Sequence, residues 1–287
     1  MKFAVSTHLY HDQRLERRHL EEVKAYGFDA VEVFATRSHI DYYDVQAIES
    51  LAGWLDRTGL RLHGIHAPIT DRLDKGDVWG RTYSIASSDP ARREEAIREV
   101  NIALDIVRRI RSEVVVLHLG VPDAKSSAAA DNNREAMRRS VAEIGELTAI
   151  AGVRLAIEVI PNALSTPEAL VRLLEDDFAE NHLGICLDFG HAFLMGDVVD
   201  AVEQASGHIV STHVHDNKRK SDDHLPPFDG TIDWPAALMA VQKVGYEGTF
   251  VFEVANVSTP RDVLEKTRSA RDRFEEVVIG WPPATEH

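Results

Sequence analysis

Cysteine is nearly absent from this chain of 287 residues, which has a single one, Cys186. One cysteine excludes an intramolecular disulfide, and a free thiol inside an apolar run is typical of a reducing compartment, so we expect a cytoplasmic protein. Long apolar segments are missing as well. No stretch approaches the roughly 18 residues of a membrane span, and the opening MKFAVSTHLY holds too short an apolar segment for a signal peptide.

Basic residues are scarce relative to acidic ones. The chain has 32 Lys and Arg against 47 Asp and Glu, which gives a formal net charge of −15. This balance disfavours a broad surface for nucleic acid or anionic membrane, so we expect a small-molecule partner, with a homo-oligomer as an open alternative to a monomer. Hydrophobic residues make up 44% of the chain, enough for one large core, and we predict a single domain over 1–287.

A glycine-rich phosphate turn is also missing, because the segment STHLYHD at the end of the first apolar run has no glycine. Its absence disfavours a doubly wound open sheet. The chain instead alternates short β-branched runs with longer amphipathic segments, which is typical of an α/β protein. Eight such runs predict a (β/α)8 TIM barrel, with the open sheet as the alternative. The runs lie at 2–6, 30–34, 60–66, 113–120, 153–160, 183–190, 208–216 and 249–255.

Helix-start signals support this alternation. The segments 87–110, 165–177 and 230–248 each place a capping residue before a proline, the usual order at a helix N-terminus. Thr166 and Asp233 are the expected N-cap residues of the last two segments. The sequence therefore predicts helices between the strands.

Ionisable residues gather where the predicted strands end. In TIM barrels the active site lies at the carboxyl ends of the strands, and chance would scatter such residues over helices and both ends of the barrel. This concentration is the strongest functional signal in the sequence. The residues are His8, Glu32, His66, His118, Glu158, Asp188, His191, His213, His215 and Glu253.

Several carboxylates and an imidazole in a dry barrel mouth would repel one another unless a positive charge neutralised them. A divalent cation does so, and mixed carboxylate and imidazole ligation suits Mn²⁺, Zn²⁺, Co²⁺, Mg²⁺ or Fe²⁺. We expect no organic cofactor. The predicted ligand set is Glu158, Asp188, His213 and Glu253.

Simpler interpretations of single residues stay open. Asp188 can be the N-cap of the segment that follows it. His66 and His118 can be histidines satisfied within the core, and His8 and Glu32 can be polar lining of the barrel mouth. The remaining histidines considered, for which we expect no specific function, are His11, His19, His39, His182 and His208.

Five motifs in order along the chain resemble the xylose isomerase-like TIM barrels. They are IEVIPN, LDFGHAF, HVHDN, DDHLPPFDGTIDW and FVFEV, and together they extend over most of the second half, while the resemblance as a whole covers essentially the whole chain. This superfamily includes sugar isomerases and epimerases, inositol-catabolism enzymes and apurinic-site endonucleases of the endonuclease IV type. The resemblance implies the same four metal ligands, prefers His213 to His215, and makes His191 a substrate-binding residue.

The resemblance implies first a metal-dependent isomerase or epimerase of a small sugar, sugar phosphate or related polyhydroxy carbonyl compound. The metal would stabilise an enediolate, and Glu158 and Glu253 would remove and return the proton. His191 would hold a substrate oxygen. Lys218 or Arg219 would contact a distal hydroxyl or phosphate.

Two other functions remain open. The endonuclease branch implies a phosphodiester hydrolase with up to three zinc ions, although the acidic charge makes nucleic acid an improbable substrate. A barrel that binds a sugar-like ligand without converting it is the third alternative. The further metal or substrate ligands that the endonuclease branch implies are His66, His118, His191, Asp222 and His224, and His215 is a further possible ligand.

The longest irregular stretch, residues 67–89, is expected to set substrate specificity. Such a loop after a barrel strand can close over an active site. Trp79 or Tyr83 would then contact the ligand, and packing on the surface is the alternative for both.

Overall fold

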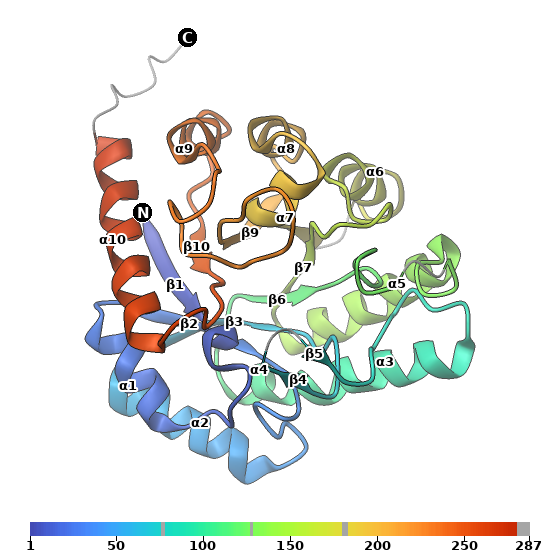
Figure 1. Ribbon diagram of the computed structural model, residues 1–287. Coiled ribbons are helices and arrows are strands. Elements are labelled where there is room, and N and C mark those ends of the chain that lie inside the picture. The colour runs from blue at the N-terminus through green and yellow to red at the C-terminus, as the bar shows by residue number, and fades with distance from the viewer. Residues whose placement is uncertain (76–77, 127–128, 180–182, 280–287) are drawn as a thin grey trace.

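Eight parallel strands close into a barrel in the computed structural model, which describes residues 1–75, 78–126, 129–179 and 183–279 (Figure 1). The first strand pairs with the last, Lys2 with Thr249, and this pairing closes the sheet. The (β/α)8 prediction is therefore confirmed, and the open sheet is wrong. The barrel strands are β1 (Lys2–Ser6), β2 (Ala30–Phe34), β3 (Arg61–His66), β6 (Val114–Leu117), β7 (Arg154–Glu158), β8 (Leu183–Asp188), β9 (Ile209–Val214) and β10 (Thr249–Phe252).

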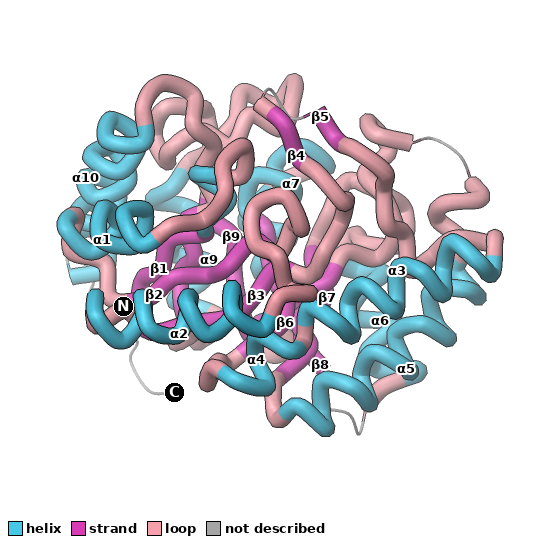
Figure 2. Tube along the Cα trace, turned by 90° about the horizontal axis from the view of Figure 1, so that it is seen from below, coloured by secondary structure: helices cyan, strands magenta, loops and turns pink. Residues whose placement is uncertain are grey.

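Helices surround the barrel, and the loops after the strands gather at one end of it (Figure 2). The capping signals are confirmed, because the side chain of Thr166 accepts a hydrogen bond from the Ala169 amide and that of Asp233 from the Ala236 amide. The helices are η1 (Thr7–Tyr10), α1 (Arg17–Ala25), α2 (Val45–Thr58), α3 (Pro90–Ala103), α4 (Asp105–Arg109), α5 (Arg134–Ala151), α6 (Pro167–Asp177), α7 (Phe189–Met195), α8 (Val198–Gln204), α9 (Trp234–Lys243) and α10 (Pro260–Ile279). Among the described residues, no helix combines the length and apolar character that crossing a membrane requires.

Alternate residues of each strand face the barrel interior, as the pleat requires. Below the carboxyl ends these inward residues are small or β-branched, and their packing leaves the barrel filled rather than hollow. Polar side chains take over at the carboxyl end of the same strands. The inward apolar residues are Ala4, Ala30, Val114, Val116, Ala156, Cys186 and Val251.

The predicted strand segments extend beyond several of the observed strands. The run 113–120 is a strand only over Val114–Leu117, because the chain then leaves the ladder. His118 lies at this departure, at the mouth of the barrel. The site residues thus stand where backbone pairing ends, and an apolar pattern alone does not mark that point.

The stretch 67–89 contains a small antiparallel hairpin that was not predicted, formed by β4 (Leu73–Asp74) and β5 (Val78–Trp79). Leu73 and Trp79 pack with Phe34 and Ile69 in an apolar cluster separate from the main core. Tyr83, in contrast, is buried within the main core. Of the two aromatic residues proposed to contact a ligand, the hairpin therefore presents Trp79.

A glycine on β3 is needed for the barrel to close tightly. A Cβ atom at Gly64 would lie 2.4 Å from the Val114 carbonyl oxygen, a backbone atom that cannot swing away. We predict that Gly64→Ala lowers the free energy of unfolding by about 1–3 kcal/mol in urea denaturation, as overpacking does. The control is Gly145→Ala in α5, where the Cβ would contact Leu183 at an ordinary 3.5 Å and alanine favours the helix. Equal effects of the two substitutions would contradict the prediction.

Candidate functional site

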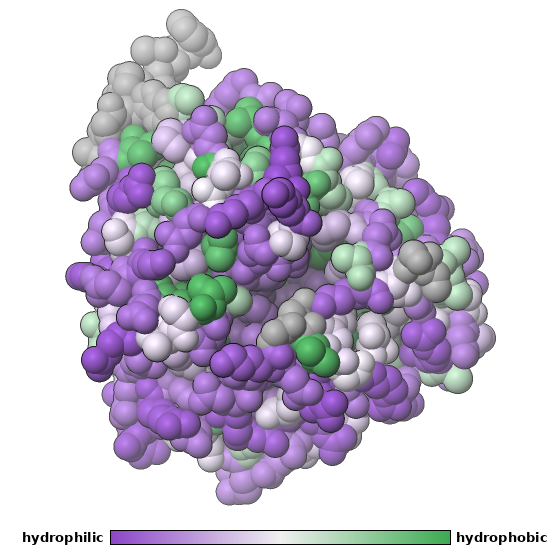
Figure 3. Space-filling view, viewed as in Figure 1, coloured by the Kyte–Doolittle hydropathy of each residue, from purple (hydrophilic) through white to green (hydrophobic). Residues whose placement is uncertain are grey.

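A cavity of about 380 Å³ opens at the carboxyl ends of the strands. Figure 3 shows a hollow near the middle of the viewed face, in a mainly hydrophilic surface. One wall is apolar and includes Phe34, Ile69, Leu73 and Trp79, the cluster that the β4–β5 hairpin completes. Most of the remaining lining residues are polar. The polar lining residues are His8, His66, His118, Lys125, His191, Lys220, Ser221, Asp222, His224 and Glu253.

The four predicted metal ligands converge at the floor of this cavity, and we call them the central cluster: Glu158, Asp188, His213 and Glu253. Strands β7, β8 and β9 supply the first three, and Glu253 is the first residue after β10. Nδ1 of His213 lies 3.0 Å from Oε1 of Glu158, 3.3 Å from Oε2 of Glu253 and 3.8 Å from Oδ2 of Asp188. All four side chains are buried, and Glu253 borders the cavity.

Two predicted histidines join the other oxygen of Glu158, which makes a second cluster of His66, His118 and Glu158. Oε2 of Glu158 lies 3.1 Å from Nε2 of His66 and 3.0 Å from Nε2 of His118. The two oxygens of this carboxylate therefore serve two different groups, because Oε1 faces His213. A carboxylate divided in this way can bridge two cations.

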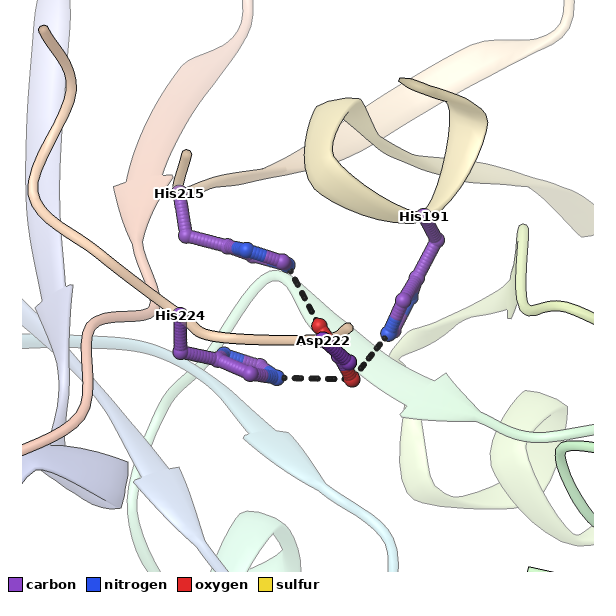
Figure 4. A group of neighbouring side chains, drawn as sticks. All are labelled: His191, His215, Asp222 and His224. Atoms are coloured by element: carbon purple, nitrogen blue, oxygen red, sulfur yellow. Dashed lines mark hydrogen bonds and ion pairs between the residues drawn. The ribbon is translucent and has the colours of Figure 1, made fainter. Parts of the chain in front are cut away.

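A third cluster consists of His191, His215, Asp222 and His224 (Figure 4). The three imidazoles point toward Asp222, with its Oδ2 at 2.9 Å from Nε2 of His191 and 3.2 Å from Nε2 of His224. Nε2 of His215 lies 3.9 Å from Oδ1 of Asp222 and 3.0 Å from Asp188. The structure thus brings His213, rather than His215, into the central cluster, and uses His215 to connect Asp188 with the third cluster.

Three histidines are held so that one ring nitrogen is free to act as a ligand. Nδ1 of His66 donates to the Ala67 carbonyl at 2.8 Å, and Nδ1 of His224 donates to the Glu253 carbonyl at 2.9 Å. Nδ1 of His191 donates to the Val159 carbonyl at 3.1 Å. A carbonyl only accepts, so Nδ1 carries the proton, and Nε2 of the neutral ring offers its lone pair to the site. This is the usual arrangement of metal-ligating histidines, and the three clusters fit divalent cations.

The electrostatics show how strongly these groups depend on one another. Burial would raise the pKa of Glu158, but His213 and His118 hold that pKa well below its ordinary value. Burial would lower the pKa of His191, but Asp188 and Asp222 hold it well above its ordinary value. Opposite charges and hydrogen bonds within the clusters cause these shifts, so in the absence of metal a proton on His191 helps to balance the carboxylates.

Asp188 acts both as a helix cap and as a member of the central cluster, so its two interpretations are compatible. Its Oδ1 accepts a hydrogen bond of 2.6 Å from the His191 amide at the start of α7. Its Oδ2 faces His213. Gly190, between the two motif residues, is needed because a Cβ there would lie 2.0 Å from the His215 ring.

The two basic residues proposed for substrate binding do not line the cavity. Lys218 is exposed, and the Arg219 guanidinium donates to the carbonyls of Phe193 and Gly196 and lies over the Phe193 ring. Their neighbour Lys220 lines the cavity instead, and its ammonium has no ion pair with any described residue. The sequence singled out the loop that lines the cavity but could not show which of its basic side chains turns inward.

The described histidines for which no function was predicted lie outside the clusters. His39 uses both ring nitrogens, on the Gln13 carbonyl and the Thr7 hydroxyl, and His19 bonds to the Glu16 amide at the start of α1. His11 contacts the His8 carbonyl. His208 pairs with Glu175 near the surface, and His182 lies outside the described residues.

Two acidic residues have larger roles than the sequence indicated. Glu32, for which polar lining of the barrel mouth was one alternative, is fully buried with Oε2 at 3.2 Å from Nε2 of His213. Asp216 accepts hydrogen bonds from the amides of Phe228 and Ile232 and from the indole of Trp234. It thereby fixes the loop that carries Asp222 and His224, which explains why HVHDN and FDGTIDW occur together. Glu32 could have been noticed as the only charge in the apolar run AVEVF.

The chain is similar to known proteins over most of its length. An uncharacterised protein of Methanocaldococcus jannaschii is 28% identical over 96% of this chain and 90% of its own length. An L-ribulose-5-phosphate 3-epimerase, UlaE, of Escherichia coli O157:H7 is 24% identical over 90% of this chain and 87% of that protein.

Solved structures of similar fold superpose on this chain over most of its length. A D-tagatose 3-epimerase-like protein superposes with a TM-score of 0.77 at 25% identity and 97% coverage of both chains. The IOLI protein with a bound zinc atom superposes with a TM-score of 0.76 at 17% identity, over 96% of this chain and 98% of its own. The family described as "Xylose isomerase-like TIM barrel" matches residues 20–276. The chain therefore belongs to the xylose isomerase-like TIM barrel family.

Proposed function

We propose that this protein is a divalent-metal-dependent isomerase or epimerase of a small sugar, sugar phosphate or related polyhydroxy carbonyl compound. The observation that carries the proposal is the central cluster at the floor of a cavity, three buried carboxylates around Nδ1 of His213. The relationship to sugar epimerases over nine-tenths of the chain supports it. The metal is Mn²⁺, Zn²⁺, Co²⁺, Mg²⁺ or Fe²⁺ on the basis of this donor set.

The chemistry follows from where the side chains lie. A divalent cation bound by the central cluster supplies Lewis-acid stabilisation of negative charge on the carbonyl and hydroxyl oxygens of the substrate. Glu253, which borders the cavity, removes the proton from the carbon next to the carbonyl. Glu158, the other glutamate of the central cluster, returns a proton to it. His191 lines the cavity and holds a substrate oxygen.

Other residues that line the cavity can contact the part of the substrate away from the reacting carbon. Lys220 and Lys125 are positively charged residues on its rim, and the apolar wall of Phe34, Leu73 and Trp79 faces the same space. The ammonium of Lys220, which forms no ion pair with a described residue, favours a phosphate or other anionic group on the distal end of the sugar. Lys220 therefore takes the role that the sequence suggested for Lys218 or Arg219.

A second candidate function has a specific observation in its favour. Glu158 is fully buried, and both of its oxygens already contact imidazoles of two different clusters. A bridging carboxylate in this position, together with the third cluster around Asp222, suits a phosphodiester hydrolase with up to three ions better than it suits a mobile general base. The number of bound metal ions separates the two functions.

Metal content and proton exchange test the first proposal. We predict one divalent ion per chain by elemental analysis of purified protein, and exchange of the proton next to the carbonyl into D2O with a panel of ketoses and ketose phosphates, followed by NMR. Glu253→Gln should slow this exchange by roughly 10²–10⁴-fold, the usual contribution of a general base. Exposed Glu247→Gln is the control. Three zinc ions per chain, with hydrolysis of bis(p-nitrophenyl) phosphate and no exchange, would establish the hydrolase instead.

Removal of the metal should change how stability depends on pH. The pKa values of His191 and His213 are raised well above 6.5. Burial would lower the pKa of His224, but the Asp222 carboxylate raises it to about 10. Groups with raised pKa values stabilise the fold below the unfolded value and lose this effect as pH rises through the folded value. The free energy of unfolding of chelated protein should therefore fall from pH 7 to 9.5, by up to about 1.4 kcal/mol per pH unit for each proton.

The metal-loaded protein should not show this fall, because cation binding displaces the same protons and strengthens as pH rises. Urea denaturation of chelated and reloaded protein at several pH values makes the comparison. A chelated protein whose stability stays constant or increases over this range would contradict the predicted charge balance.

Substrate charge is tested at Lys220. We predict that Lys220→Ala raises KM for a phosphorylated ketopentose by roughly tenfold, which corresponds to about 1.4 kcal/mol for one charge-assisted contact, and leaves KM for the unphosphorylated sugar nearly unchanged. Lys218→Ala removes the same charge from the same loop, outside the cavity, and serves as the matched control. If the two substitutions change KM equally, the effect comes from the overall charge of the loop and not from a contact between Lys220 and the substrate.

A further inference from the structure

Glu32 is a buried carboxylate to which the reaction has so far assigned no role. It lies in the middle of β2, inside the barrel, with no exposed surface. Its neighbours in register are Ser6 on β1 and Gly64 on β3, and neither places a positive charge beside it. Burying a lone carboxylate is costly, so a partner is needed.

The partner is His213. Oε2 of Glu32 lies 3.2 Å from Nε2 of that ring, and both side chains are fully buried. Oε1 of Glu32 has no hydrogen-bond partner among the described residues, so the contact with His213 is the one hydrogen bond that its carboxylate makes in the described part of the chain. An ionised carboxylate only accepts, so Nε2 of His213 is the donor.

The opposite nitrogen of the same ring faces the central cluster. Nδ1 of His213 lies within 3.8 Å of all three of its carboxylates. A proton fixed on Nε2 leaves Nδ1 of a neutral ring as a lone pair directed at the position of the cation. In His66, His191 and His224, Nδ1 donates to a backbone carbonyl and Nε2 is the nitrogen left for a cation. In His213 the two nitrogens are exchanged: Nε2 donates, and its acceptor is a charged carboxylate instead of a carbonyl.

We propose that Glu32 is a positioning residue that fixes the tautomer and orientation of His213 and makes its Nδ1 a stronger donor to the cation. The proposal rests on metal binding by the central cluster. Glu32 does not border the cavity and touches no substrate. It acts through His213, as carboxylates behind metal-ligating histidines do.

The isosteric Glu32→Gln variant tests this role with metal alone. Its amide oxygen can still accept from Nε2, but the negative charge is gone. We expect a 10–100-fold weaker affinity for Zn²⁺ and Mn²⁺ in competition with a chelator, the usual effect of such a change. Glu32→Asp, which keeps the charge on a shorter arm, should recover part of the affinity. Glu32→Leu removes both features and should bind metal most weakly.

A control variant distinguishes the effect of the contact between Glu32 and His213 from the general effect of removing a buried charge. Glu99 is another buried glutamate, which accepts hydrogen bonds from the hydroxyls of Tyr42 and Tyr43 away from the cavity. Glu99→Gln removes a buried charge in the same way and should lower stability without altering the metal affinity of the folded protein. Equal loss of metal affinity in Glu99→Gln and Glu32→Gln would overturn the proposal.

NMR of protein with isotope-labelled histidine detects the contact between Glu32 and His213 independently of catalytic activity. The proton on Nε2 of His213 should give a slowly exchanging downfield signal that moves in Glu32→Gln and disappears in Glu32→Leu, in zinc-loaded and in metal-free protein alike. A signal that does not respond to either substitution, or metal affinity within twofold of wild type in Glu32→Gln, would overturn the proposal. Wild-type protein that binds no divalent cation would contradict the proposed function, and the metal-free spectra would still decide whether Glu32 holds the ring.

Discussion

The burial of several carboxylates at one end of the barrel is the constraint on which the rest of the site depends. Glu32, Glu158 and Asp188 are fully buried, and Glu253 is nearly so. No lysine or arginine reaches them within the described contacts, and histidines alone surround them. Such a group is stable only if protons or cations supply positive charge, and histidine is the residue that can give up its proton when a cation arrives.

Hydrogen bonds fix the orientation of the histidine rings in these clusters. Backbone carbonyls fix three of the imidazoles through Nδ1, and the carboxylate of Glu32 contacts the fourth through Nε2. The loop between β9 and α9 supplies Asp222 and His224, and Asp216 stabilises it through several hydrogen bonds. His224 in that loop has a positive φ of 45°, a costly conformation that the surrounding contacts maintain.

The central cluster is compatible with both proposed reactions, sugar epimerisation and phosphodiester hydrolysis. The residues that line the cavity favour different substrates for the two. The lining combines an apolar cluster with Lys125 and Lys220, which fits the small anionic substrate proposed above better than a nucleic-acid polymer. This favours the epimerase proposal. The division of Glu158 between two clusters is the feature that a single-ion enzyme does not need. One barrel therefore retains the side chains for more cations than the simpler chemistry requires.

Much of the fold was predictable from the sequence, because strand and helix periodicity and capping residues are local features. Strands at 2–6 and 30–34 and the caps at Thr166 and Asp233 agree with the structure residue for residue. The convergence of Glu158, Asp188, His213 and Glu253 was also predictable, because parallel strands of a barrel end together.

Tertiary structure alone decided the rest. The sequence could not show that Lys220 turns inward while Arg219 turns away, since loop backbone determines that choice. Nor could it connect Glu32 with His213, which are 181 residues apart in the chain. They meet only because the barrel closes, and a contact across a closed barrel has no counterpart in local sequence.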